Sequence, residues 1–138
     1  MKRMKTIGPI LAVPLFVNCA TVFAQGCDGV DTALTDARRV EYAALVAKAL
    51  APTVRAGQVE IRHVFQDGTW SAVEAATPVS DIGVFFFDAS GGAKRFKDVW
   101  GGLADASERP QLVGWASKLG VPARLAQCFA WFETGRGG

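Results

Sequence analysis

Apolar and polar side chains alternate most regularly between Gln58 and Gly102, and this stretch predicts two consecutive β-hairpins. Asp67-Gly68 supplies residues that tolerate the positive φ of a tight turn. The second strand begins at Trp70 and ends at Thr77-Pro78, because proline cannot donate to a strand ladder. The first strand has the period of two of a half-buried strand, with alternate positions holding Val59, Ile61, His63 and Phe65.

The register of this first hairpin decides which side chains share a face of the sheet. A loop of two or four residues pairs Phe65 with Trp70 and puts His63 diagonally across from Glu74. One face then carries Val59, Ile61, His63, Phe65, Trp70, Ala72, Glu74 and Ala76. A three-residue loop would move Trp70 to the opposite face, so the sequence leaves the register open.

The second hairpin is predicted from a strand at Gly83–Asp88 and a returning strand at Ala93–Trp100. Phe85-Phe86-Phe87 sends large apolar groups to both faces of the sheet, which is typical of a central strand. The returning strand is more polar, and its charges suit an edge position.

Helical spacing returns near the C-terminus. One apolar stripe consists of Leu112, Trp115, Ala116 and Leu119 and predicts a short amphipathic helix. Gly120 can end this helix. Pro122 suits the first turn of another helix, whose stripe is Leu125, Cys128, Phe129 and Phe132. Cys128–Glu133 also alternates like a short strand, so residues 130–134 are left open between helix and strand.

A helix is also expected before the sheet, from about Ala33 to Ala51, capped by Asp31 or Thr32 and ended by Pro52. The order of elements predicts an α+β domain. We expect a four-stranded antiparallel sheet of two consecutive hairpins, flanked by this N-terminal helix and one or two C-terminal helices. The helices are expected to cover one face of the sheet.

Residues 1–24 have the pattern of a secretory signal peptide, with a cut after Ala24. The pattern consists of a basic start, an apolar run at Ile7–Val17 and the cleavage positions Val22-Phe23-Ala24. A membrane anchor is the alternative, but the apolar run is short, contains prolines and lacks stop-transfer charges. We therefore expect residues 25–138 to form one small domain in the periplasm or secreted, with no stable membrane insertion after cleavage.

Removing the leader changes the charge balance of the chain. Three of its 15 basic residues lie there, which leaves 12 basic against 13 acidic residues, a net charge of −1 with histidine neutral. The tight basic cluster that remains, Lys94, Arg95 and Lys97, is typical of a solvated strand edge. A nucleic-acid partner is therefore not expected.

Cys27 and Cys128 remain after the leader, which contains Cys19, has been removed. In an oxidising compartment two cysteines pair most simply with each other. Their bond would close a loop of about 100 residues, to which the chain-entropy model assigns about 4.7 kcal/mol. The alternative is a pair of free thiols, one of them reactive.

His63 is the only histidine, which limits the catalytic and metal chemistry open to this chain. A zinc site needs three or four ligands, so neither a metal site nor a cofactor is predicted. The sequence also lacks GxSxG, HExxH and a phosphate loop. His63 with Glu74 is the strongest acid–base candidate, because a neighbouring carboxylate favours the charged imidazole. The structural alternative is a pair whose members satisfy each other at the margin of an apolar face.

Trp70 and Trp100 stand beside turns or glycines, where a ring can be partly exposed and anchor a partner. The alternative is that both rings cap the ends of the core. We expect an exported, non-enzymatic binding module, of an inhibitor or immunity type, that docks on another envelope protein. The alternative is a small periplasmic enzyme that uses His63 and Glu74 as its acid–base pair.

Overall fold

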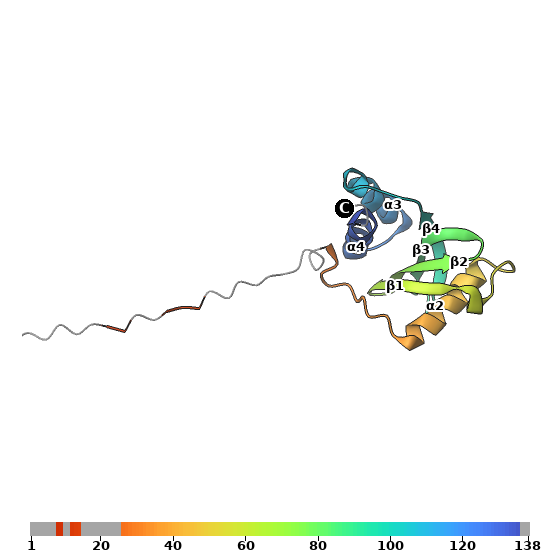
Figure 1. Ribbon diagram of the computed structural model, residues 1–138, viewed down its shortest axis with the longest axis horizontal. Coiled ribbons are helices and arrows are strands. Elements are labelled where there is room, and N and C mark those ends of the chain that lie inside the picture. The colour runs from red at the N-terminus through yellow and green to blue at the C-terminus, as the bar shows by residue number, and fades with distance from the viewer. Residues whose placement is uncertain (1–7, 10–11, 15–25, 136–138) are drawn as a thin grey trace, which may run out of the picture.

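The computed structural model describes residues 8–9, 12–14 and 26–135 (Figure 1). The predicted leader and its cut after Ala24 fall largely outside the described residues. In the described parts of the chain, no helix is long and apolar enough to cross a membrane. The elements are α2 (Asp36–Ala49), η1 (Ala56–Gln58), β1 (Glu60–Asp67), β2 (Trp70–Thr77), β3 (Ser80–Asp88), β4 (Arg95–Gly101), η2 (Ala106–Glu108), α3 (Arg109–Leu119) and α4 (Ala123–Thr134).

The predicted α+β fold is confirmed. The strands form one antiparallel sheet in the order β1-β2-β3-β4, with one helix before it and two helices after it. β3 lies between β2 and β4, as its three consecutive phenylalanines predict. β4 is the largely exposed edge strand that its charged residues predict.

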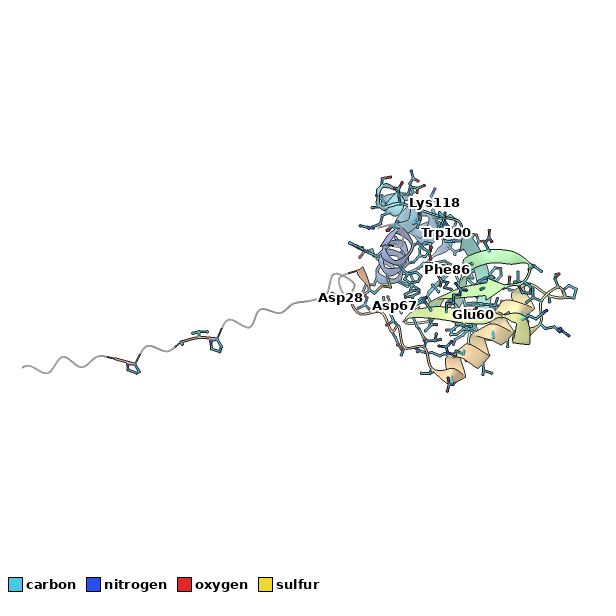
Figure 2. All side chains as sticks on the ribbon, in the orientation of Figure 1. Asp28, Glu60, Asp67, Phe86, Trp100 and Lys118 are labelled. Atoms are coloured by element: carbon cyan, nitrogen blue, oxygen red, sulfur yellow. A yellow bond between two sulfur atoms is a disulfide. The ribbon has the colours of Figure 1, made fainter. Side chains whose placement is uncertain are left out.

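The helices cover both faces of the sheet, so the expectation of one covered face was wrong (Figure 1). Phe85 and Phe87 pack with Tyr42 and Val46 of α2, whereas Phe86 packs on the opposite face against α3 and α4. Three aromatic residues in a row point to alternate faces, and apolar cover is needed on each face. In Figure 2, Phe86 lies between the sheet and α4.

The first hairpin has a two-residue loop, but its register differs from the one expected. Trp70 pairs with Asp67 and not with Phe65, and Phe65 lies opposite Ala72. An irregularity between Ile61 and His63 leaves Arg62 as an extra residue in β1. This bulge turns Ile61 towards α2, whereas His63 and Phe65 stay on the face of Trp70, Ala72 and Glu74.

The N-terminal helix begins later than predicted, and Thr35 caps it by accepting a hydrogen bond from the Arg38 amide. The segment before it is engaged elsewhere. The Asp31 backbone forms an isolated bridge to Gln66 of β1, and the Asp31 side chain accepts from the Ala33 amide. These bonds hold the chain extended beside the sheet, so the helix starts only after them.

Helix α4 continues to Thr134, which resolves the open choice at residues 130–134 in favour of helix. Gly120 ends α3 in the left-handed conformation, as expected for a helix C-terminus. Cys128 of α4 is bonded to Cys27, 101 positions earlier in the chain, so the predicted disulfide is present. The bond attaches the start of the described domain to the middle of α4.

Candidate functional site

His63 and Glu74, the predicted acid–base pair, are in contact. They lie directly opposite each other on β1 and β2, not diagonally, and His63 Nδ1 is 3.1 Å from Glu74 Oε1. The Glu74 side chain is only 1% exposed, whereas the imidazole is 52% exposed. A buried carboxylate therefore orients an imidazole that solvent can reach.

Aromatic rings surround the same imidazole. The ring of Phe132 on α4 lies 4.6 Å from that of His63, and Phe65 stacks at 6.3 Å. Phe65 and Phe132 also contact each other, with centroids 4.8 Å apart. These contacts fix the orientation of the imidazole and join β1 to α4, so the pair also has a structural role.

Trp70 and Trp100, the predicted anchors, are both partly buried and packed against the core beneath α3 and α4. The Trp100 ring meets Phe129 edge-on, with centroids 5.6 Å apart. Trp70 covers Gly120, where an added Cβ would lie 3.2 Å from its ring. Each ring therefore has a packing role and presents only part of its surface to solvent.

A hollow of about 670 Å³ lies where the start of β3, the segment after β4 and the end of α4 meet. Its apolar wall includes Ile82, Ala104 and Leu103, the last being 96% exposed. The titratable residues that line it are Asp81, Asp105, Glu108 and Glu133. We call this hollow the Glu133 pocket.

Local folding explains two of these four acids. Asp105 caps η2 by accepting a hydrogen bond from the Ser107 amide, and Glu108 reaches back to the Asp105 amide. This reciprocal arrangement is a capping box, recognisable in the sequence as Asp-x-x-Glu. The hydrogen bonds from the Ser107 side chain and backbone lower the pKa of Asp105, so this carboxylate stays ionised at the mouth of the pocket.

Glu133 has no such explanation. Only 7% of the residue is exposed, and its buried Oε1 has no hydrogen-bond partner. Burial raises the pKa of Glu133 to about 7. The residue also sits in the last turn of α4, where the negative end of the helix dipole disfavours a carboxylate.

Arg109, at the start of α3, contacts two residues of α4, one before Glu133 in the sequence and one after it. Its guanidinium lies over the Trp131 ring at 3.7 Å, and its Nε donates to Thr134 Oγ1 at 2.9 Å. Thr134 in turn donates to the Ala130 carbonyl. Arg109 therefore contacts residues before and after Glu133, and these contacts hold the end of α4 in place.

A smaller hollow of about 270 Å³ lies on the other side of the molecule, between α2 and β4. Its basic residues are Lys48, Lys94 and Arg95, and Phe87 and Phe96 form part of its apolar wall. Lys94 is already paired with Glu41 and lies over the Tyr42 ring, 4.5 Å from its centroid. One of its three cations is therefore neutralised within the fold.

Neither hollow is lined by His63 or Glu74. Within the described residues, no group of three or more His, Cys, Asp or Glu side chains is arranged to hold a metal ion. No family model matches the chain, and no curated protein or solved structure matches it significantly.

The sequence interpretation missed Glu133, although the helical spacing carried a signal. Leu125, Phe129 and Glu133 are separated by four residues each, so the acid continues a stripe of buried apolar side chains. An acid on such a stripe is either paired or has a raised pKa. The open choice between helix and strand at residues 130–134 concealed this relationship.

Proposed function

We propose that the chain is an exported binding module that docks on another protein of the cell envelope through the Glu133 pocket. The observation that carries this proposal is the pocket itself, in which a buried carboxylate without a hydrogen-bond partner adjoins an apolar wall. Ligand sites are typically concave and mostly apolar, with a few polar groups that fix orientation.

Leu103 supplies the apolar contact at the mouth of the pocket. It is almost fully exposed, so the free protein lacks the stabilisation that burying a large aliphatic side chain would provide. Its neighbours Gly102 and Ala104 also line the pocket. A partner seated there would cover Leu103 and approach Trp100, since an added Cβ on Gly102 would lie 4.0 Å from the Trp100 ring.

The test is affinity capture from an envelope extract of the host with immobilised protein and two matched variants. Leu103→Ser removes the exposed aliphatic group at the pocket, and Val40→Ser removes one from α2, where Val40 is 73% exposed. We expect Leu103→Ser to weaken capture by about tenfold or more, because interface anchors commonly contribute about 2 kcal/mol. Val40→Ser should capture the partner normally. Equal capture by both variants would contradict docking at this pocket.

Export is part of this proposal, and the disulfide supports it, because such bonds persist in oxidising compartments. We expect osmotic shock to release a mature protein that begins at Gln25. Intact mass measurement on the released protein tests this directly. A released chain that retains Met1 to Ala24 would contradict cleavage of the leader.

A second candidate function rests on the His63–Glu74 pair. A solvent-accessible imidazole held by a buried carboxylate is an arrangement used for general acid–base catalysis, with Glu74 as the positioning residue. Turnover of ester, amide or glycoside substrates that disappears in His63→Ala would support an enzyme. A docking module should instead keep its partner without the imidazole, so capture by His63→Ala separates the two functions.

A further inference from the structure

The charged side chains that line the Glu133 pocket are all acidic. The side chains that line it include four acids, and none of its lining side chains is basic among the residues that the structure describes. Asp105 and Glu108 belong to the capping box of η2, and Asp81 lies exposed at the start of β3. The pocket therefore concentrates negative potential against an apolar wall, which attracts a cation.

Glu133 shows where that cation would be bound. Leaving a buried acceptor without a partner costs about 1–3 kcal/mol, and more for a charged group. The free protein reduces this cost by holding a proton on Glu133, whose pKa is about 7 because of burial. A ligand cation would replace that proton and supply the missing hydrogen-bond donor at once.

The apolar wall restricts the kind of cation that fits. Ile82, Leu103 and Ala104 offer contact to hydrocarbon, so a small hydrated ion would leave this surface unused. Lysine and arginine side chains carry a charged head on an aliphatic stem, and such stems pack readily along apolar surface. A basic side chain matches both parts of the pocket.

Resting on the proposed function, we propose that the partner inserts a lysine or arginine side chain into the Glu133 pocket. The head pairs with the Glu133 carboxylate, and the stem lies against Leu103 and Ile82. Asp81, Asp105 and Glu108 add attraction around the head. Arg109 is occupied by Trp131 and Thr134, so it does not neutralise Glu133 through a hydrogen bond.

The same geometry makes binding depend on pH. Below about pH 7 Glu133 is protonated, and binding a cation requires the loss of that proton. Affinity should therefore rise as the pH increases through this value. The other acids that face the head are those of β3 and η2, and Arg109 of α3 is the cation packed against α4.

The experiment titrates the whole mature protein with three blocked peptides that differ in one side chain: acetyl-Gly-Lys-Gly-amide, acetyl-Gly-Arg-Gly-amide and acetyl-Gly-norleucine-Gly-amide. Backbone NMR signals of Ala104 and Glu133 report occupancy. We expect saturable shifts with the lysine and arginine peptides and none with norleucine. The relative response to lysine and arginine identifies the preferred head group.

Variants of matched charge test the role of Glu133. Glu133→Gln should weaken binding of the basic peptides about tenfold or more and remove its rise with pH, because the hydrogen bond to a charged group is lost. Asp81→Asn, an exposed change at the same pocket, should weaken binding less. Asp36→Asn removes the same charge from α2 on the opposite face of the sheet and should have no effect.

Equal binding of norleucine and lysine peptides, or no saturable binding of any peptide up to its solubility limit, would overturn the basic-side-chain proposal. Neither result tests the proposed function, which is tested separately by the capture experiment with Leu103→Ser. If Leu103→Ser abolishes capture while Glu133→Gln preserves it, the pocket docks a partner without a buried cation. If capture does not depend on Leu103, docking at this pocket fails as well.

Discussion

The ring of Phe86 meets the ring of Phe129 edge-on, with centroids 5.1 Å apart, and this contact joins the centre of the sheet to α4. Phe129 is also the residue against which Trp100 and Trp115 pack. The position of α4 therefore depends on β3. Because α4 carries both Cys128 and Glu133, this aromatic contact helps to position the disulfide and the candidate pocket together.

Substitution of the three consecutive phenylalanines tests the two-faced core. Phe85→Ala, Phe86→Ala and Phe87→Ala should each lower the free energy of unfolding by about 3–5 kcal/mol, because all three rings are buried. Urea denaturation measures the loss. Phe96→Ala is the matched control on β4, where the ring is 40% exposed, and should cost less. If any of the three costs no more than Phe96→Ala, one face is not packed as described.

Reduction of the disulfide should destabilise the fold without any change of sequence. The bond joins cysteines 101 positions apart, and removing a native disulfide from a small domain typically costs about 2–5 kcal/mol. Guanidinium denaturation with and without reductant measures the difference. The same midpoint in both conditions, with complete reduction verified by thiol titration, would show that the bond contributes nothing.

The alternation at Val59–Asp88 predicts the hairpin fold because side chains of successive strand residues point to opposite faces. It could not predict the bulge at Arg62, since that depends on packing between Ile61 and α2. The late start of α2 likewise depends on the distant bridge from Asp31 to Gln66. The sequence predicted the His63–Glu74 contact, whereas the Glu133 pocket is built from three separate segments that meet only in the fold.

His63→Phe tests whether the hydrogen bond to Glu74 stabilises the fold apart from the ring contact. Phenylalanine preserves an aromatic ring next to Phe132 but removes the nitrogen that faces the buried carboxylate. We expect a loss of about 1–3 kcal/mol in the free energy of unfolding, because a buried acceptor loses one partner. Arg62→Ala, the exposed neighbour in the bulge, should change it by no more than about 1 kcal/mol. Equal effects of the two variants would rule out a stabilising role for this hydrogen bond.

Glu133 should make the folded protein less stable as the pH rises. Burial raises its pKa from 4.5 to about 7, so between these values the folded state binds more protons than the unfolded state. Below about pH 4.5 Glu133 therefore does not lower the free energy of unfolding. Above that pH its destabilising effect grows until the pH exceeds about 7. The shift corresponds to at most about 3 kcal/mol.

Glu133→Gln removes this penalty, because glutamine has the same shape and no charge to bury. The variant should match the wild type near pH 4.5 and become more stable than it towards pH 8, by up to about 3 kcal/mol. Urea denaturation across this range measures the difference. Asp81→Asn, an exposed change at the same pocket, is the control variant. If Glu133→Gln and the wild type keep the same separation at every pH, Glu133 is already ionised near its ordinary pKa. Its carboxylate must then have a partner in solution, and the reason to expect an inserted basic side chain disappears.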